Sequence, residues 1–455
     1  MTAPTSTTDQ SDTSVLLSES AAADESKACP PPVEGGPRFG PNRLARFRAP
    51  SFRHFSGERV GNHKLQPARF FVPALLAVLT LTACSKQDFP QYPPNYREYA
   101  YVTNGDSGTV TVLDVVNVRV DREISVGQNP VAVIASPTRS EVYVVNSGAE
   151  GGQGSISVID AEKNAVAATI PLHRKPVSID LNAEGTLAYV ANSGSNSISV
   201  IDLTARQEIA QIGAGEEPVS ARITPDGKTL VVANRRGNSV SMIDAAARRV
   251  RSIFDGCPGA ADVAILPDSS KAFVACSAGH QVMAIALANS KFSPAQPDRL
   301  ESMLDVGRAP VQLALKPDGG EVFVSNSLSN SISEIDTSKN DVGGAYMIGD
   351  DPVRGLVSSD NALLYVANFR SQYVTIYSID EGKRLPTSIR GLPPSIHVGD
   401  GPLALEFSSN GLLFFVVDNR SADVAVVRTA TRSLFTILPT GRSPNAISVK
   451  AFKVP

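Results

Sequence analysis

The feature that most constrains this chain is a short pattern, Tyr-Val-x-Asn, that returns in variant form eight times after residue 95. Its aromatic and β-branched residues favour a pleated, half-buried strand, and its closing Asn favours a turn. The copies span residues 101–104, 143–146, 189–192, 231–234, 273–276, 323–326, 365–368 and, with one extra residue, 415–419. They recur at intervals of 42 to 51 residues, so each copy belongs to a larger repeated unit.

Three more strands complete each unit. A second strand follows the Asn and usually ends in an Asp suited to a turn, as at Asp114, Asp160 and Asp202. A further strand ends in a Gly-x-x-Pro loop, and the strand after that Pro runs into a turn such as the Pro-Asp-Gly of residues 225–227. Four short strands in about 40–45 residues are typical of one blade of a β-propeller.

The repeat resembles that of the YVTN family of β-propellers, whose motif stands intact at residues 101–104. The resemblance runs from Tyr99 to the C-terminus. The chain contains no Trp, which excludes a repeat of the Trp-Asp type. The fifth copy departs most from the pattern, because Cys276 replaces the Asn and no Asp follows its next strand.

The ends of the repeat region predict how the ring closes. The chain enters at Tyr101 without a preceding first strand, and residues 444–452 form a first strand with nothing after it. We therefore expect an all-β, eight-bladed propeller whose C-terminal strand joins the N-terminal blade, leaving no free sheet edge. Seven blades remain the alternative, if one divergent unit is an elaboration. Apolar residues one, three and five places after each Pro predict the core between blades.

The segment before the ring predicts export. Residues 1–59 are expected to be disordered or a mis-assigned N-terminal extension, with translation starting near Val60. Residues 60–84 read as a signal peptide whose Leu-Thr-Ala-Cys ending resembles a lipobox, which makes Cys84 the lipidation site. The alternatives are an uncleaved anchor and an ordinary signal peptide. Residues 85–98 then form a tether to a propeller at residues 99–455, and Ser85 favours the outer membrane over the inner one.

Four Cys residues occur in the chain, and two of them fall within the ring. Cys257 precedes the first strand of blade 5 and Cys276 ends the second strand, so both lie at the same end of one hairpin. An exported protein meets an oxidising compartment, and we expect a disulfide between them. Two separately buried thiols are the alternative.

The sequence contains no recognisable catalytic constellation. Its five His residues form no zinc or c-type haem motif, and there is no nucleophile elbow or phosphate-binding loop. We therefore expect no cofactor, no metal and no catalytic residues. The formal net charge of −3 gives no reason to expect nucleic-acid binding.

Propeller topology predicts where ligands would bind. The Gly-x-x-Pro loops and the loops that follow each Asn should emerge on one face of the ring. The second position after each Pro should lie nearer the axis, where blades 3 to 7 present a polar arc. The candidate binding residues are Ser178, Ser220, Asp262, Gln312, Arg354, Arg370, Tyr373, Arg235 and Arg236. The opposing interpretation is solvated loops around a water-filled channel.

These features favour a lipid-anchored binding or scaffolding module in the cell envelope. Its partner would be another envelope protein or an extracellular ligand, and the lipid would be its only membrane contact. The alternative is a propeller enzyme or cofactor carrier, since propellers similar in fold include lactonases and haem d1-binding domains. Asp262 and His280 are the residues that such chemistry could use, and neither has an evident partner in the sequence.

Overall fold

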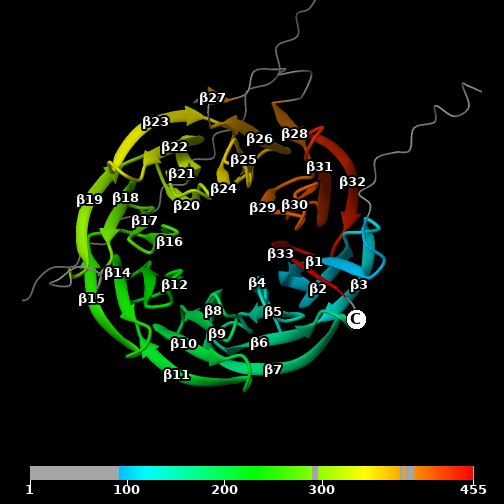
Figure 1. Cartoon of the computed structure of the whole chain (residues 1–455), viewed down its shortest axis with the longest axis horizontal. Coiled ribbons are helices and arrows are strands. Elements are labelled where there is room, and N and C mark those ends of the chain that lie inside the picture. The colour runs from blue at the N-terminus through cyan, green and yellow to red at the C-terminus, as the bar shows by residue number, and fades with distance from the viewer. Residues whose placement is uncertain (1–91, 289–295, 380–382, 385–393, 454–455) are drawn as a thin grey trace, which may run out of the picture. The chain divides into compact units, whose positions relative to one another are not determined.

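The computed structural model describes residues 92–288, 296–379, 383–384 and 394–453. Strands dominate these residues and form eight sheets arranged as a ring (Figure 1). Each sheet runs from an innermost to an outermost strand, and neighbouring strands are antiparallel throughout. The sequence-based prediction of an eight-bladed β-propeller is confirmed, and the seven-bladed alternative is wrong.

Blades 1 to 4 follow the chain in order, with the innermost strand given first. Blade 1 consists of β33 (Pro444–Lys453), β1 (Tyr96–Asn104), β2 (Thr109–Asp114) and β3 (Arg119–Ser125). Blade 2 consists of β4 (Pro130–Ala135), β5 (Glu141–Asn146), β6 (Gln153–Asp160) and β7 (Ala165–Arg174). Blade 3 consists of β8 (Pro176–Leu181), β9 (Leu187–Asn192), β10 (Ser197–Asp202) and β11 (Gln207–Gly213). Blade 4 consists of β12 (Pro218–Ile223), β13 (Thr229–Asn234), β14 (Ser239–Asp244) and β15 (Arg249–Asp255).

Blades 5 to 8 complete the ring. Blade 5 consists of β16 (Ala260–Ile265), β17 (Lys271–Cys276), β18 (Gln281–Ala286) and β19 (Arg299–Asp305). Blade 6 consists of β20 (Pro310–Leu315), β21 (Glu321–Asn326), β22 (Ser331–Asp336) and β23 (Asp341–Met347). Blade 7 consists of β24 (Pro352–Val357), β25 (Leu363–Asn368), β26 (Tyr373–Ser378), β27 (Lys383–Arg384) and β28 (Ser395–His397). Blade 8 consists of β29 (Pro402–Phe407), β30 (Leu413–Asp418), β31 (Asp423–Arg428) and β32 (Ser433–Pro439). Two 3-10 turns, η2 (Gly105–Ser107) and η3 (Ser327–Ser329), lie in loops.

The hydrophobic core is divided among the interfaces between blades. Each of eight buried clusters combines side chains from two adjacent sheets, and none is confined to one blade. Ala221 and Ile223, three and five places after Pro218, pack against blade 3, and Leu313 packs against blade 5 in the same way. The side chains at these odd-numbered positions therefore form interblade core, as the period-two pattern predicts.

The ring closes through β33, which pairs with β1 over its whole length (Figure 1). Two buried charged side chains of blade 1 also reach the neighbouring blades. Glu98 accepts a hydrogen bond from the backbone N–H of Ser409 in blade 8, at 2.6 Å. Lys450 donates to the carbonyl of Ser136 in blade 2, also at 2.6 Å. The last strand of the chain thus completes the sheet that the first strand begins.

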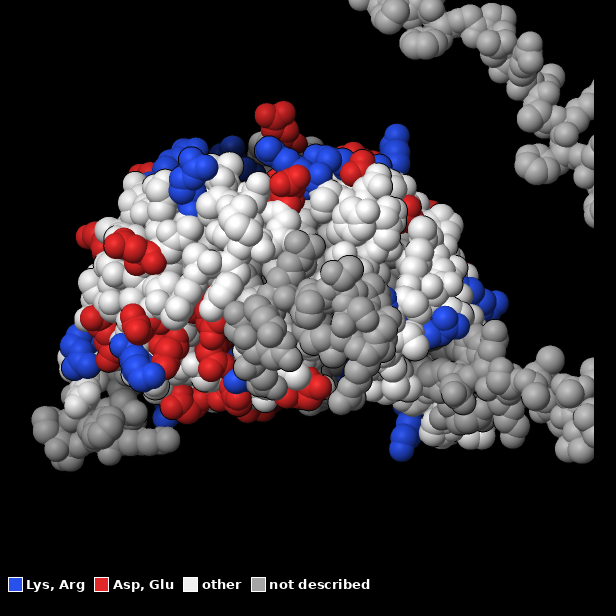
Figure 2. Space-filling model, turned by 90° about the horizontal axis from the view of Figure 1, so that it is seen from above, with Lys and Arg blue, Asp and Glu red and all other residues white. Residues whose placement is uncertain are grey.

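The two faces of the ring are built differently. The loops joining second to third strands and the loops joining blades emerge on one side, which we call the loop face. The turns joining first to second strands and third to fourth strands emerge on the other side, which we call the turn face. Figure 2 shows Lys and Arg beside Asp and Glu at both rims of the flank that it presents. Among the described residues, no helix is long and apolar enough to cross a membrane.

A buried Asn at the end of the second strand organises the loop face in six blades. Its Nδ2 donates to a Ser or Thr hydroxyl on the third strand, as from Asn234 to Ser241 and from Asn326 to Ser333, both at 2.9 Å. In five of these blades the Gly of the preceding interblade loop packs on the same Asn, whereas blade 3 has His173 at the position of that Gly. A Cβ on Gly215 would lie 2.6 Å from the Asn234 side chain, a distance that no methyl group tolerates. We call this contact the Gly–Asn junction.

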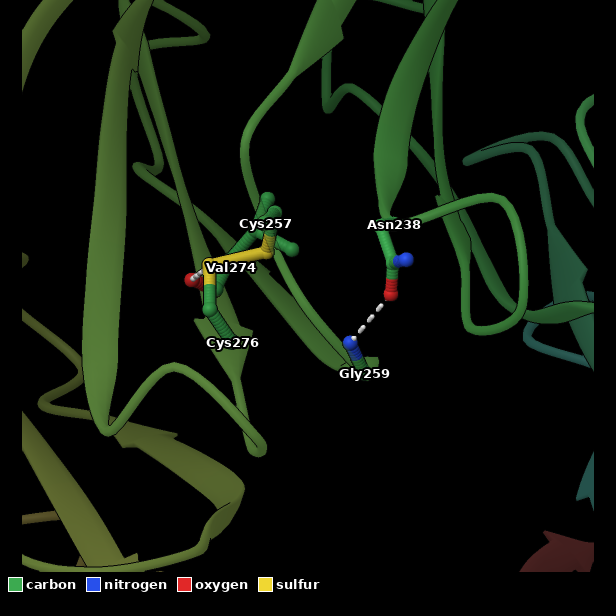
Figure 3. The surroundings of a disulfide bond; sticks show 5 residues. All are labelled: Asn238, Cys257, Gly259, Val274 and Cys276. Atoms are coloured by element: carbon green, nitrogen blue, oxygen red, sulfur yellow. Dashed lines mark hydrogen bonds between the residues drawn. A yellow bond between two sulfur atoms is a disulfide. The ribbon is translucent and has the colours of Figure 1, made fainter.

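Blade 5 replaces the Gly–Asn junction with a disulfide (Figure 3). Cys257 occupies the position of the Gly and Cys276 the position of the Asn, with Cα atoms 4.8 Å apart. Both side chains are fully buried. The neighbouring Asn238 side chain accepts a hydrogen bond from the Gly259 N–H at 3.0 Å, which connects the loops of blades 4 and 5.

Blade 8 corrects one part of the sequence interpretation. The predicted repeat placed its anchor at Asn419, one residue late. In the structure Asp418 pairs with Pro402 and Asp423, which is the register that Asn326 has with Pro310 and Ser331 in blade 6. Asp418 is therefore the true anchor, and Asn419 begins the loop. The sequence pattern selected residue 419 because the motif ends in Asn, whereas the strand pairing of β30 places the anchor one residue earlier.

The predictions made for the N-terminal segment concern residues before residue 92, where the described chain begins. The extension at 1–59, the signal peptide at 60–84, the lipidation site Cys84 and the first part of the tether lie outside the described residues. They remain predictions. The described chain begins at the turn face, where the Asn410 side chain donates to the Tyr92 hydroxyl at 3.3 Å.

Candidate functional site

The nine predicted binding residues fall into two groups in the structure. Three of them, Asp262, Gln312 and Arg354, line one cavity of about 480 Å³ between the inner strands of blades 3 to 7. We call this the axial cavity. Its other lining residues include Pro225 and Pro317, which belong to turns of the turn face. The cavity thus reaches the end of the ring opposite to the loops.

The inner strands direct these side chains in a uniform way. In every blade the register of the innermost strand shifts just after its first residue, as between Pro310 and Gln312. Such a bulge adds one unpaired residue, bends the strand and re-aims the side chains that follow. Ser220, Gln312 and Arg354 directly follow this bulge, whereas Asp262 lies within the wider irregularity between Ala260 and Val263. All four stand two places after the first residue of their strands.

Several polar side chains of the axial cavity hold the ring together. The inner edge of each first strand carries backbone N–H groups with no strand beside them. Asp262 accepts from the Leu313 N–H of the next blade at 3.1 Å, and Gln312 accepts from the Gly355 N–H at 2.7 Å. Such bonds satisfy donors that would otherwise be left unpaired. These two residues consequently have a structural role, whatever else they bind.

The two predicted serines contribute little free hydrogen-bonding capacity. The Ser220 hydroxyl donates to Asp262 at 3.4 Å and is otherwise buried. The Ser178 hydroxyl is buried with no hydrogen-bond partner among the described residues, and it does not line the axial cavity. Of the five residues predicted to form a polar arc over blades 3 to 7, only those of blades 5, 6 and 7 line the axial cavity.

The prediction missed three charged residues of the channel. Asp180, Arg222 and Glu406 stand four places after the first residue of their strands, whereas the sequence analysis considered only the second place. Asp180 accepts from the Ile223 N–H at 2.9 Å and lies 3.7 Å from the Arg222 guanidinium. Burial raises the pKa of Asp180 and of Glu406. Side chains at the second and fourth places lie on the same face of a strand, so the alternation that indicated the second place indicates the fourth as well.

Among the charged side chains that line the axial cavity, Arg354 has the fewest interactions with other described residues. Within the described part of the chain it makes no hydrogen bond and no ion pair, although its side chain is accessible from the channel. Desolvation by the surrounding strands lowers the pKa of Arg354, while the charge of Asp262 acts in the opposite direction. The guanidinium keeps its five donors available for a ligand.

The other predicted residues lie on the loop face. Arg370 forms an ion pair with Asp351 at 3.3 Å, and Tyr373 meets the His397 ring edge-on at 4.9 Å between centroids. Arg235 and Arg236 both approach Glu217, at 3.9 Å and 3.6 Å. None of these four residues lines the axial cavity. The structure thus places Arg354 in the axial cavity and leaves Arg370 and Tyr373 outside it, on the loop face.

The loop face carries an apolar cluster that the sequence analysis did not identify. Leu328 of η3 is 59% exposed, Met347 at the end of β23 is 68% exposed, and Tyr373 at the start of β26 is 44% exposed. All three lie in blades 6 and 7. Large apolar side chains gathered on one surface are typical of interaction sites. Because loop residues have no periodicity, the sequence offered no signal for Leu328 or Met347.

Hydrogen bonds join the loops around this cluster into one rim. In blade 6, the Asn330 side chain donates to Asp350 at 3.1 Å. The Phe369 N–H of blade 7 donates to the Asp351 carbonyl at 2.8 Å. In blade 8, the Arg420 guanidinium stacks over the Phe369 ring at 4.4 Å. We call this continuous surface of blades 6 to 8 the loop-face rim; it comprises Leu328, Met347, Phe369, Arg370, Tyr373 and Arg420.

His280, Asp262 and His173 take part in contacts within the described ring. The Nδ1 of His280 accepts from the Ala309 N–H at 3.2 Å, and Asp262 accepts from β20. His173 contacts Glu208 at 3.1 Å. In the residues that the structure describes, no three or more His, Cys, Asp or Glu side chains form a group that could hold a metal ion.

Comparison with known proteins identifies the fold. No protein-family model and no curated protein matches the chain. Among solved structures, the dihydro-heme d1 dehydrogenase NirN in complex with DHE is similar over 81% of this chain and 78% of its own, with a TM-score of 0.62 and 14% identity. Apo AztD from Citrobacter koseri is similar over 79% and 99%, with a TM-score of 0.58 and 14% identity. A functionally unknown protein from Desulfotomaculum acetoxidans is similar over 77% and 98%, with a TM-score of 0.51 and 14% identity. At such identity the likeness extends to the propeller fold alone.

Proposed function

We propose that this chain is an exported, lipid-anchored propeller of the YVTN-repeat type that binds another envelope protein through the loop-face rim. The observation that carries the proposal is the exposure of three large apolar side chains, Leu328, Met347 and Tyr373, on the loop face of two adjacent blades, in a region that also carries Arg370 and Arg420. Aromatic, Met and Arg side chains are enriched at the centres of protein interfaces, where an apolar anchor is surrounded by polar groups.

The construction of the rim supports a docking role. Hydrogen bonds join its loops in blades 6 and 7, and the Arg420 guanidinium of blade 8 stacks on Phe369 of blade 7, so a partner would meet a surface that is already ordered. Preorganised loops lose little conformational entropy on binding, which favours affinity. Arg370, on the same face, forms an exposed ion pair with Asp351 at 3.3 Å. A complementary partner would offer an apolar side chain flanked by acidic groups.

The path of the chain supports the same choice of face. Residue 92 lies at the turn face, close to Asn410. If Cys84 carries lipid, the eight residues from 84 to 92 span at most roughly 28 Å. The turn face would then lie toward the membrane and the loop face away from it. A partner in the surrounding compartment would reach the loop-face rim without meeting the lipid surface.

Site-specific photo-crosslinking tests the proposal. A photoreactive phenylalanine would replace Tyr373 or Leu328 in the full chain, and intact cells would be irradiated before lysis. Ile253 provides the matched control, because it is 56% exposed but lies on β15 at the outer side of blade 4. We expect one protein to be captured at residues 328 and 373 and not at 253.

Purified components give the second half of the test. We expect Tyr373→Ala and Arg420→Ala to weaken binding of the captured protein by about tenfold or more each, as interface anchors do. The same substitution at Ile253 should leave binding unchanged. Equal capture at all three positions, or full affinity after both rim substitutions, would remove the rim as the docking surface.

A further inference from the structure

The axial cavity has the size of a small-molecule site. Its volume of about 480 Å³ falls within the range typical of ligand pockets, roughly 300–1,000 Å³. Its wall is divided about evenly between polar and apolar surface. Ile223, Ile265, Leu315 and Val357 belong to the apolar part, and charged and amide side chains supply the rest. Such a pocket suits an organic ligand that combines an apolar body with a charged or polar group.

The polar and charged side chains of the axial cavity differ in whether they already bind a neighbouring residue. Asp180 and Asp262 each accept a backbone N–H from the next blade, and Gln312 does the same. Arg222 lies within 3.7 Å of Asp180. These four side chains are committed to neighbours on the ring. Arg354 has no hydrogen bond or ion pair with any residue that the structure describes.

The Arg354 side chain is exposed within the axial cavity, and no residue that the structure describes occupies its guanidinium donors. Those donors are therefore open to an anion, and the guanidinium keeps its charge because arginine does not lose its proton in proteins. The planar fork of Arg matches a carboxylate with two parallel hydrogen bonds. Asp180, Asp262 and Glu406 nearby disfavour a ligand of higher negative charge.

We propose that the axial cavity binds a small organic monocarboxylate, whose carboxylate is held by the Arg354 guanidinium and whose apolar body lies against Ile265, Leu315 and Val357. One free cationic group corresponds to one negative charge on the ligand. Gln312, fixed by its bond to Gly355, lies beside Arg354 in the lining and retains its NH₂ donors. The site does not depend on the proposed docking function, because its lining residues do not include the loop-face rim.

Three probes of similar kind test the assignment with the full chain. Benzoate is the carboxylate probe, benzamide is its uncharged counterpart of the same shape, and inorganic phosphate is the alternative anion. Binding is measured by calorimetry at fixed ionic strength. We expect benzoate to bind and benzamide to bind at least tenfold more weakly. Phosphate should also bind at least tenfold more weakly than benzoate.

Variants of the guanidinium separate its role from general charge. Arg354→Gln should weaken benzoate binding by tenfold or more, and Arg354→Lys should give an intermediate loss because it keeps the charge without the fork. Arg249→Gln is the matched control, since Arg249 is exposed on the outer strand β15 and carries the same charge. Circular dichroism establishes that each variant folds.

A crystal soaked with 4-bromobenzoate supplies a measurement that needs no variant. We expect the anomalous bromine signal between β16 and β24, with the carboxylate at Arg354. A signal only outside the axial cavity, or no binding of benzoate, overturns the proposal. Equal affinity for benzoate and benzamide, or tighter binding of phosphate, overturns the assignment of a carboxylate.

Discussion

Blades 5 and 8 both lack the Asn anchor that the other six blades carry on the loop face, but they replace it with different chemistry. Blade 5 replaces the Gly–Asn junction with the disulfide of Cys257 and Cys276. Blade 8 keeps its Gly399 but replaces the Asn with Asp418. Both anchors are fully buried. One blade therefore fixes the junction with a covalent bond, and the other places an ionisable carboxylate there.

The third strands of the two blades changed together with their anchors. Where the anchor is Asn, a Ser or Thr on the third strand accepts from its Nδ2, as Ser241 and Ser333 do. Blade 5 has Met283 at this position, and blade 8 has Ala425. Neither can accept that bond. The Asn anchor and the hydroxyl on the third strand therefore occur together, and the two blades that lack the Asn also lack the hydroxyl.

Blade 8 also gains a second acid. Asp423 stands opposite Asp418 on the neighbouring strand, and one oxygen of each carboxylate is buried without a hydrogen-bond partner among the described residues. Burial and the neighbouring Asp423 raise the pKa of Asp418 to about 8. Burial raises the pKa of Asp423 as well. A proton shared by the two carboxylates would satisfy both oxygens.

The largest expected effect is a dependence of stability on pH that arises in blade 8. Asp418 holds its proton up to about pH 8 in the folded chain and releases it near its ordinary pKa when unfolded. The folded state therefore binds more protons between these values, and stability falls as pH rises. Between pH 5 and 8 the free energy of unfolding should fall by roughly 4 kcal/mol from this group.

Rebuilding the common junction tests this explanation. Asp418→Asn with Asp423→Ser gives blade 8 the pair found at Asn326 and Ser331. Urea unfolding at several pH values should show a flatter pH dependence than the unaltered chain. Asn326→Asp in blade 6 should introduce a similar dependence there. An unchanged slope in the rebuilt chain would show that the pair is not its source.

The next effect is the loss of the disulfide in blade 5. Cys257→Ser with Cys276→Ser should lower the free energy of unfolding by about 3 kcal/mol, as expected for closing a loop of this length. Dithiothreitol should lower the stability of the unaltered chain and leave the variant unchanged. Replacing Cys257, Cys276, Gln281 and Met283 by Gly, Asn, Ser and Ser should recover part of the loss. No response of the unaltered chain to the reductant would contradict the role of the bond.

A smaller effect is expected at an ordinary junction. Gly215→Ala would place a methyl group 2.6 Å from the Asn234 side chain, so repacking should cost about 1–3 kcal/mol. Gly213→Ala is the control, because a Cβ at that position meets nothing within 4 Å. Thermal unfolding of both variants measures the difference. Equal melting temperatures would mean that the Asn side chain yields easily.

The smallest effect should come from restoring one hydroxyl in blade 8. Ala425→Ser gives Asp418 the donor that its blade lacks, and the hydroxyl should stabilise the ionised carboxylate. We expect a gain of about 1 kcal/mol above pH 8 and less at pH 5. Unfolding by urea at both pH values checks this. A gain that is the same at both values would place the benefit in packing and not in the carboxylate.

Much of this architecture could be predicted because propeller blades repeat. The recurring strand pattern located the eight sheets, and the unmatched ends at Tyr101 and Pro444 predicted how the ring closes. The fine register was harder. Asn419 looked like the anchor of blade 8, whereas strand pairing selects Asp418. A one-residue choice of this kind depends on the opposing strand, which the local sequence does not specify.

The candidate sites were predictable only in part. The alternation after each Pro found Asp262, Gln312 and Arg354 but gave no reason to separate them from Arg370 and Tyr373. The structure separates them, because the first group lies on the inner strands and lines the axial cavity, whereas the second lies on the loop face. Loop residues such as Leu328 carry no period, so their gathering on one rim could not be inferred.

The sequence by itself determined the number of blades, the closure of the ring and the pair of cysteines, since each follows from a pattern repeated or broken along the chain. The tertiary structure alone decided which polar side chains are occupied and which are free. Asp262 and Arg354 hold equivalent places in the sequence, but only Asp262 meets a backbone N–H of the next blade. The physical reason is that hydrogen bonds between the inner strands of adjacent blades depend on the position of the neighbouring blade, which no single repeat encodes.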